Sequence, residues 1–192
     1  MRGAGVQIPA SPPSGTNVNP KPIYIGEAIA FVLKYIEELP AWDPALWSKT
    51  AIRTTPKRCF VGSSISTAIM RLTPQSVLDD FNTFGYLFES LCTRDLRVYS
   101  QSIDGAVYHY RDKNGLEADC IVHLNDGRWG AIEVKLGSRK IGETAEHLKI
   151  LRDKVDANKM KAPSFLMVLT GTEYAYKRED DVLIVPIGCL KD

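Results

Sequence analysis

Two neighbouring stretches of the chain carry acidic residues and a lysine at spacings that could perform chemistry. Asp119 lies in the first stretch, and Glu133 and Lys135 lie in the second. The tripeptide Asn-Asp-Gly at 125–127 separates them and is typical of a tight turn, so the two stretches are predicted to be strands of one hairpin. Two carboxylates beside an amine can hold a divalent cation and a water, and this chemistry suits phosphodiester hydrolysis.

The length of the turn decides whether the two carboxylates can meet, because side chains on a strand alternate between its faces. A two-residue turn would place Asp119 opposite Val134 and send Asp119 and Glu133 to opposite faces. A three-residue turn with Gly127 left-handed would place Asp119 opposite Glu133, with Cβ atoms about 5 Å apart. We prefer the three-residue turn as a hypothesis, because it separates an apolar face from a polar one. The apolar face would hold Ala118, Cys120, Val122, Ile132 and Val134, and the polar face Glu117, Asp119, Glu133 and Lys135.

The hypothesis assigns a role to each member of the polar face. Asp119, Glu133 and the backbone carbonyl of Val134 would bind Mg²⁺ or Mn²⁺, which prefer hard oxygen ligands. Lys135 would orient the attacking water or stabilise the phosphorane. Glu89 interrupts an apolar helical pattern and is either an auxiliary acid of the site or an ordinary helix-surface glutamate. The alternative for the whole set is the wet face of a half-exposed hairpin.

Composition limits the class of protein more than its function. The chain has 192 residues and a net charge of +1, which fits one ordinary domain and does not mark a nucleic-acid binder by bulk charge. Its sequence shows no secretory signal and no apolar run of membrane-span length, so we expect a cytoplasmic protein without membrane contact. The four cysteines are scattered, and Cys92 and Cys120 sit in apolar patterns that predict small buried hydrophobes.

The order of the predicted elements indicates a mixed α/β sheet flanked by helices. We divide the chain into a disordered tail at 1–22, a small helical segment at 23–73 and an α/β domain at 74–192. The pair Arg111 and Asp112 is expected at a solvated hairpin end. Helices are predicted at 25–39, 64–70, from 74 and at 81–96 and 141–155, and strands at 107–111, 116–136 (the hairpin), 164–170 and 182–187.

Four linked motifs resemble a known family. FGYLFES at 84–90, YHYRD at 108–112, EAD at 117–119 and IEVK at 132–135 resemble the C-terminal domain of unknown function that follows the ATPase module in many bacterial and archaeal AAA-type ATPases. That domain is similar to restriction endonucleases of the PD-(D/E)XK superfamily. The resemblance runs from about Trp42 to the C-terminus.

The resemblance implies a restriction-endonuclease-like fold and a metal-dependent nuclease acting on DNA. Glu89, Asp119, Glu133 and Lys135 match the superfamily's acidic and lysine positions. Gly62 stands where the family usually has an aspartate, and the ATPase module is missing, so the chain is expected to be a fragment, a stand-alone paralogue or a degraded copy. Two rivals stay open. One is a catalytically idle regulatory or DNA-binding module, and the other is a domain that docks an ATPase partner through Trp42, Trp47 and Phe60.

Overall fold

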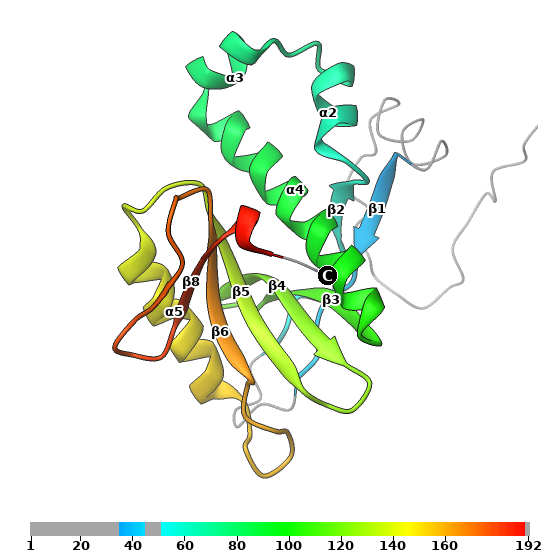
Figure 1. Ribbon diagram of the computed structural model, residues 1–192. Helices are drawn as coiled ribbons and strands as arrows, with labels where there is room; N and C mark the ends of the chain where they lie inside the picture. The colour runs from blue at the N-terminus through cyan, green and yellow to red at the C-terminus, as the bar shows by residue number, and fades with distance from the viewer. Residues whose placement is uncertain (1–34, 45–50, 191–192) are drawn as a thin grey trace, which may run out of the picture.

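The computed structural model describes residues 35–44 and 51–190, and in this part of the chain a mixed sheet carries helices on both faces (Figure 1). The main sheet has the strand order β3-β4-β5-β6-β8-β7, and β1 and β2 form a separate pair. The predicted class, a mixed α/β sheet flanked by helices, is confirmed. The strands are β1 Ile36–Leu39, β2 Lys57–Phe60, β3 Gly105–Arg111, β4 Glu117–Leu124, β5 Trp129–Lys135, β6 Phe165–Thr170, β7 Tyr176–Lys177 and β8 Leu183–Pro186. The helices are α2 Ser63–Ile69, α3 Pro74–Asp79, α4 Phe81–Ser102 and α5 Ile141–Lys154, with a 3₁₀ turn, η1, at Ile187–Cys189.

The β4–β5 hairpin has the three-residue turn predicted for residues 125–127. The Leu124 N–H donates to the Arg128 carbonyl at 2.8 Å, and Gly127 takes a left-handed φ of 82° that suits glycine. The ladder keeps this register as far as the pair of Cys120 and Ile132. The predicted register is therefore confirmed.

Two apolar clusters fill the opposite faces of the sheet. The cluster beneath α4 includes Phe88, Cys92 and Cys120, and the cluster beneath α5 includes Leu148 and other residues of that helix. Cys92 and Cys120 are fully buried, as their apolar surroundings predict. Because both faces are covered, every residue of β5 before its last one is buried.

A bulge in β4 interrupts the alternation of its side chains. Tyr108 pairs with Ile121 and Tyr110 pairs with Ala118, so two β4 residues stand opposite one β3 residue. Ala118 consequently packs in the α5 cluster, whereas Cys120 packs in the α4 cluster. The prediction that Ala118 and Cys120 share one apolar face was wrong, because it assumed strict alternation through the bulge.

The second half of the sheet is parallel. Strands β5 and β6 pair in parallel and are joined by α5, and β6 pairs in parallel with β8. All of β6 except Phe165 is buried, as expected for a short apolar strand covered on both faces. The two-residue edge strand β7 was not predicted, because so short a stretch shows no periodicity.

Helices α2, α3 and α4 precede the main sheet, and α3 and α4 begin after residues whose side chains accept backbone N–H groups. The Thr73 hydroxyl accepts the Ser76 N–H at 3.2 Å at the start of α3, and the Asp80 carboxylate accepts the Thr83 N–H at 3.3 Å at the start of α4. The helices predicted at 64–70, from 74, at 81–96 and at 141–155 are confirmed, although α4 continues to Ser102. Among the described residues, no helix combines the length and apolarity needed to cross a bilayer.

The helix predicted at 25–39 is wrong over residues 35–39, because Tyr35 lies in no helix or strand. Residues 36–39 form β1, which pairs antiparallel with β2. Leu39 is buried in the α4 cluster. The spacing of apolar residues also fits a helix, but packing against the core selects a short strand here. The remainder of that predicted helix and the predicted tail at 1–22 lie outside the described residues.

Trp42 belongs to the core rather than to a docking surface. Its side chain is 3% exposed, and its ring centroid lies 4.7 Å from that of Trp129. The Trp42 backbone N–H donates to the His109 carbonyl at 2.7 Å, which ties this segment to β3. Its proposed use for docking a partner was therefore wrong. Trp47 lies outside the described residues, and Phe60 is half-buried.

Asp112 is buried, and the prediction of a solvated hairpin end was wrong at this residue. One carboxylate oxygen accepts the N–H groups of Asn114 at 2.8 Å and Leu116 at 3.0 Å. The other accepts the Lys154 ammonium at 2.7 Å, so α5 covers the turn. Burial raises the pKa of Asp112, but Lys154 and the two N–H donors outweigh it and hold the pKa below its ordinary value.

The substitution Asp112→Ala should lower the free energy of unfolding by about 3 kcal/mol, because it leaves Lys154 and two backbone N–H groups without their acceptor. Urea denaturation followed by circular dichroism measures the loss. Asp126→Ala is the matched control, since the half-exposed Asp126 carboxylate also accepts a turn N–H, from Arg128 at 2.9 Å. The control should lose much less, because water solvates the exposed Asp126 carboxylate and screens its ion pair. Equal losses in the two variants would contradict a structural role for burial at Asp112.

Candidate functional site

Asp119 lies at the bulge of β4, where the hairpin ladder ends. One carboxylate oxygen accepts the Val134 N–H at 2.9 Å, so the side chain takes the place of a backbone acceptor. The same oxygen lies 3.8 Å from Lys135 Nζ, and the other oxygen lies 3.9 Å from Lys57 Nζ. Asp119 is thus held by a backbone donor and flanked by two ammonium groups.

Glu133 is buried on β5 beside Lys135. It is 4% exposed, and its carboxylate accepts a hydrogen bond from Lys135 Nζ at 2.7 Å. Burial, and then the charge of Asp119, raise the pKa of Glu133 to about 8 against the opposing effect of Lys135. A carboxyl with such a pKa can gain or lose a proton near neutrality, which is a property of functional sites.

Glu89 reaches the same place from α4. Its carboxylate accepts a hydrogen bond from Lys57, and the two groups form an ion pair. Burial, and then the Asp119 charge, raise the pKa of Glu89, although Lys57 opposes both effects. Glu89 therefore shares a lysine with Asp119 and is not an isolated glutamate on a helix surface.

Lys57 is the member of this cluster that sequence reasoning missed. It lies on β2, and its side chain is 38% exposed. Burial lowers the pKa of Lys57, but Glu89 and Asp119 outweigh it and raise the pKa above its ordinary value. The sequence shows Lys57 only as one of several basic residues between 49 and 58, and no local spacing relates it to the hairpin.

The cluster, called the acid–lysine site below, joins residues from four elements. The α4 helix, β4 and the end of β5 supply the carboxylates, and β2 and β5 supply the amines. The four residues predicted from the sequence come together, with Lys57 added. Its members are Lys57, Glu89, Asp119, Glu133 and Lys135.

The oxygen donors of the acid–lysine site suit a cation with few protein ligands. The Val134 N–H faces Asp119, and in a paired strand the carbonyl of the same residue points to the same edge. Asp119, Glu133 and this carbonyl are hard donors of the kind that Mg²⁺ combines with water. Across residues 35–44 and 51–190, no group of three or more His, Cys, Asp or Glu side chains is arranged around one metal position.

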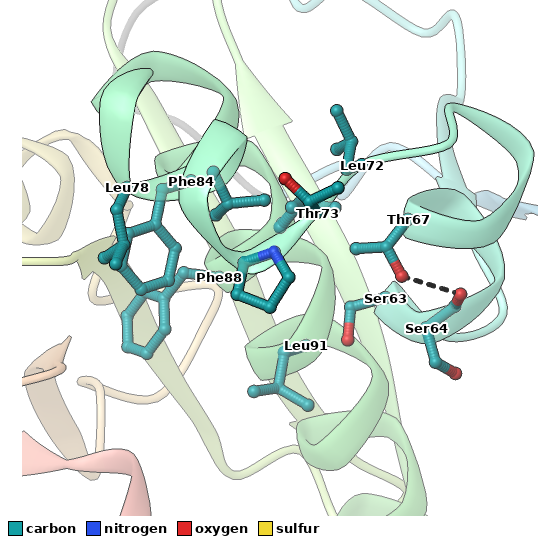
Figure 2. Close-up of a pocket in the computed structure, with 12 residues that line it drawn as sticks. Ser63, Ser64, Thr67, Leu72, Thr73, Leu78, Phe84, Phe88 and Leu91 are labelled. Atoms are coloured by element: carbon teal, nitrogen blue, oxygen red, sulfur yellow. Dashed lines mark hydrogen bonds between the residues drawn. The ribbon is translucent and has the colours of Figure 1, made fainter.

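An apolar pocket of about 610 Å³ lies apart from the acid–lysine site, where α2, α3 and α4 meet. Figure 2 shows Phe84, Phe88 and Leu91 of α4 along one side, with residues of α2 and of the α2–α3 connection along another. The lining contains no charged side chain, so the pocket offers no acid or base. Its residues are Ser63, Ser64, Thr67, Leu72, Thr73, Pro74, Val77, Leu78, Phe84, Leu87, Phe88 and Leu91.

The fold and the site define a mixed α/β domain in which carboxylates and lysines converge at the end of a β-hairpin. A family model described as Domain of unknown function (DUF4143) matches residues 84–190, and the chain belongs to this family. The predicted assignment to a domain of unknown function is confirmed. The matched range contains the three carboxylates and Lys135, whereas Lys57 precedes it. No curated protein and no solved structure matches the chain.

The raised pKa of Glu133 should make the protein less stable as the pH increases. The carboxyl has its ordinary pKa of 4.5 in the unfolded chain and a pKa of about 8 in the folded one, so the folded state binds the extra proton between these values. The free energy of unfolding should therefore fall from about pH 5 to pH 8, with a slope from this group of up to about 1.4 kcal/mol per pH unit. Urea denaturation across this range in metal-free buffer measures the slope.

Glu133→Gln removes the ionisation and should flatten the pH profile. Glu143→Gln is the control, because Glu143 is exposed in the first turn of α5 and should leave the profile unchanged. A Glu133→Gln profile as steep as that of the wild type would contradict the assigned pKa.

Proposed function

We propose that the chain is a restriction-endonuclease-like domain that hydrolyses phosphodiester bonds of DNA with Mg²⁺ or Mn²⁺, in association with an AAA-type ATPase. One observation carries the proposal. Asp119 and Glu133 both lie within 4 Å of Lys135 Nζ at the end of the β4–β5 hairpin. Two carboxylates beside one amine match the donor set that such hydrolysis needs.

Each residue of the proposed site has a distinct task. Asp119, Glu133 and the Val134 carbonyl hold the cation, and the Val134 N–H fixes the orientation of Asp119. A bound cation lowers the pKa of its water and offsets charge on the phosphate. Lys135 donates hydrogen bonds to the attacking water or to the charged phosphorane. Glu89 serves as an auxiliary acid.

The surroundings of the site support an anionic substrate. The Lys135 side chain is 31% exposed, so it can contact a group from solvent, while Glu133 lies behind it at 5%. Arg139 and Lys140 are exposed in the connection between β5 and α5, a few residues beyond Lys135. Cations so placed can contact the phosphates that flank a scissile bond. The choice of DNA follows the resemblance to restriction endonucleases.

A second candidate, a catalytically idle regulatory module, is favoured by a different observation. Every carboxylate of the acid–lysine site already lies within 4 Å of a lysine ammonium. Internal ion pairs of this kind can hold a fold together without any cation. This candidate predicts that the site binds no divalent metal and cuts no nucleic acid.

Asp119→Ala should abolish metal-dependent nicking of plasmid DNA, with a fall in rate of about 100-fold or more, because a metal ligand and its charge are lost. The assay compares wild type and variant with Mn²⁺ or EDTA and follows the conversion of supercoiled plasmid. Melting temperatures measured on the same samples report metal binding separately from cleavage.

Asp126→Asn is the matched control, because Asp126 is an acid of the same hairpin at its opposite, exposed end. This variant should nick DNA at the wild-type rate. Absence of both Mn²⁺ stabilisation and nicking in the wild type would favour the idle module. Nicking that survives in Asp119→Ala would assign the activity to another site or to a contaminant.

A further inference from the structure

Lys57 occupies the part of the acid–lysine site that a cation would need. Its ammonium pairs with Glu89 and lies 3.9 Å from one oxygen of Asp119. The other oxygen of Asp119 is taken by the Val134 N–H and faces Lys135. The Asp119 oxygen nearest to Lys57 is therefore the one left for a divalent cation, and Lys57 neutralises it from outside the hairpin.

The position of Lys57 in the fold allows it to withdraw. Strand β2 has four residues and pairs with β1 in a sheet separate from the main one. A lysine reaches its partners through a flexible four-carbon stem, and the Lys57 side chain is 38% exposed. Lys135, by contrast, is anchored on the central strand β5. The two lysines thus differ in how easily each can leave the carboxylates.

We propose that Lys57 is a tethered competitor for the divalent cation. With Lys57 in place, its ammonium holds Glu89 and Asp119 together and stands in for a cation. Metal binding requires Lys57 to leave Asp119, which frees that carboxylate and turns Glu89 toward other partners. The inference rests on the proposed function and adds regulation to it, because whatever draws Lys57 away, such as a phosphate of the substrate, would admit the metal.

Electrostatics sets the direction of the effect. An ammonium about 4 Å from a carboxylate oxygen would lie close to a divalent cation bound there, and like charges at such a distance repel strongly in a half-buried site. The charge-assisted hydrogen bond between Lys57 and Glu89 must also break. Removal of the Lys57 charge should therefore strengthen metal binding, whereas a lysine with a purely structural role would not affect it.

The test measures Mn²⁺ binding to the full chain by isothermal titration calorimetry, so it does not depend on cleavage. Lys57→Met should bind Mn²⁺ at least about tenfold more tightly than the wild type, a difference of about 1.4 kcal/mol. Lys57→Arg keeps the charge and should bind no more tightly than the wild type. Lys57→Met combined with Asp119→Asn should lose the gain, because the freed carboxylate is then absent.

Lys149→Met is the matched control, since Lys149 also pairs with two carboxylates, Glu146 at 2.6 Å and Asp180 at 3.1 Å, but outside the site. It should leave Mn²⁺ affinity unchanged. Circular dichroism melting confirms that each variant folds, and Mn²⁺ should raise the melting temperature of Lys57→Met more than that of the wild type.

The outcomes separate this inference from the proposed function. Equal Mn²⁺ affinity of wild type and Lys57→Met would overturn the inference and leave the proposed function standing. Tighter binding by Lys57→Met with no DNA cleavage by any variant would support the inference and remove the proposed function. Absence of Mn²⁺ binding in both proteins would overturn the two together.

Discussion

The register of the β4–β5 hairpin is the constraint on which the rest of the site depends. Gly127 takes the left-handed conformation that closes a three-residue turn, and this turn sets the pairing along both strands. A slip of one residue would move every side chain of one strand to the other face. Asp119 would then lose the Val134 N–H, and the carboxylates would no longer share Lys135. The bulge in β4 inserts one extra residue at Asp119, so the strand pairing shifts at the residue whose carboxylate accepts the Val134 N–H.

Burial of the end of β5 raises the pKa of Glu133, which the hairpin register places in the site. Helices α4 and α5 cover both faces of the sheet, so the end of β5 carries Glu133 into an environment with little water. Burial and Asp119 disfavour its charge, and Lys135 only partly compensates. The cluster therefore holds three carboxyl groups beside two ammonium groups, and Glu133 keeps its proton below about pH 8.

The part of the chain before the matched family range completes both the core and the site. Trp42 fills a position against Trp129, and Lys57 reaches Asp119 from β2. Asp112 and Lys154 fasten the β3–β4 turn to α5 in a similar way. These contacts link residues far apart in sequence, so the sheet, its helical covers and the N-terminal strands form one interdependent structure.

Local signals in the sequence determined the turn at Gly127, the helix that starts at Pro74, the buried strand β6 and the convergence of Asp119, Glu133 and Lys135. Each depends on neighbouring residues or on strand periodicity, which can be read without a partner element. Tertiary structure alone decided that residues 36–39 form a strand, that Ala118 changes face at the bulge and that Asp112 is buried. It also brought Lys57 to Asp119. Such features arise from packing between distant segments, and no local pattern encodes which lysine, helix end or core position will meet a given side chain.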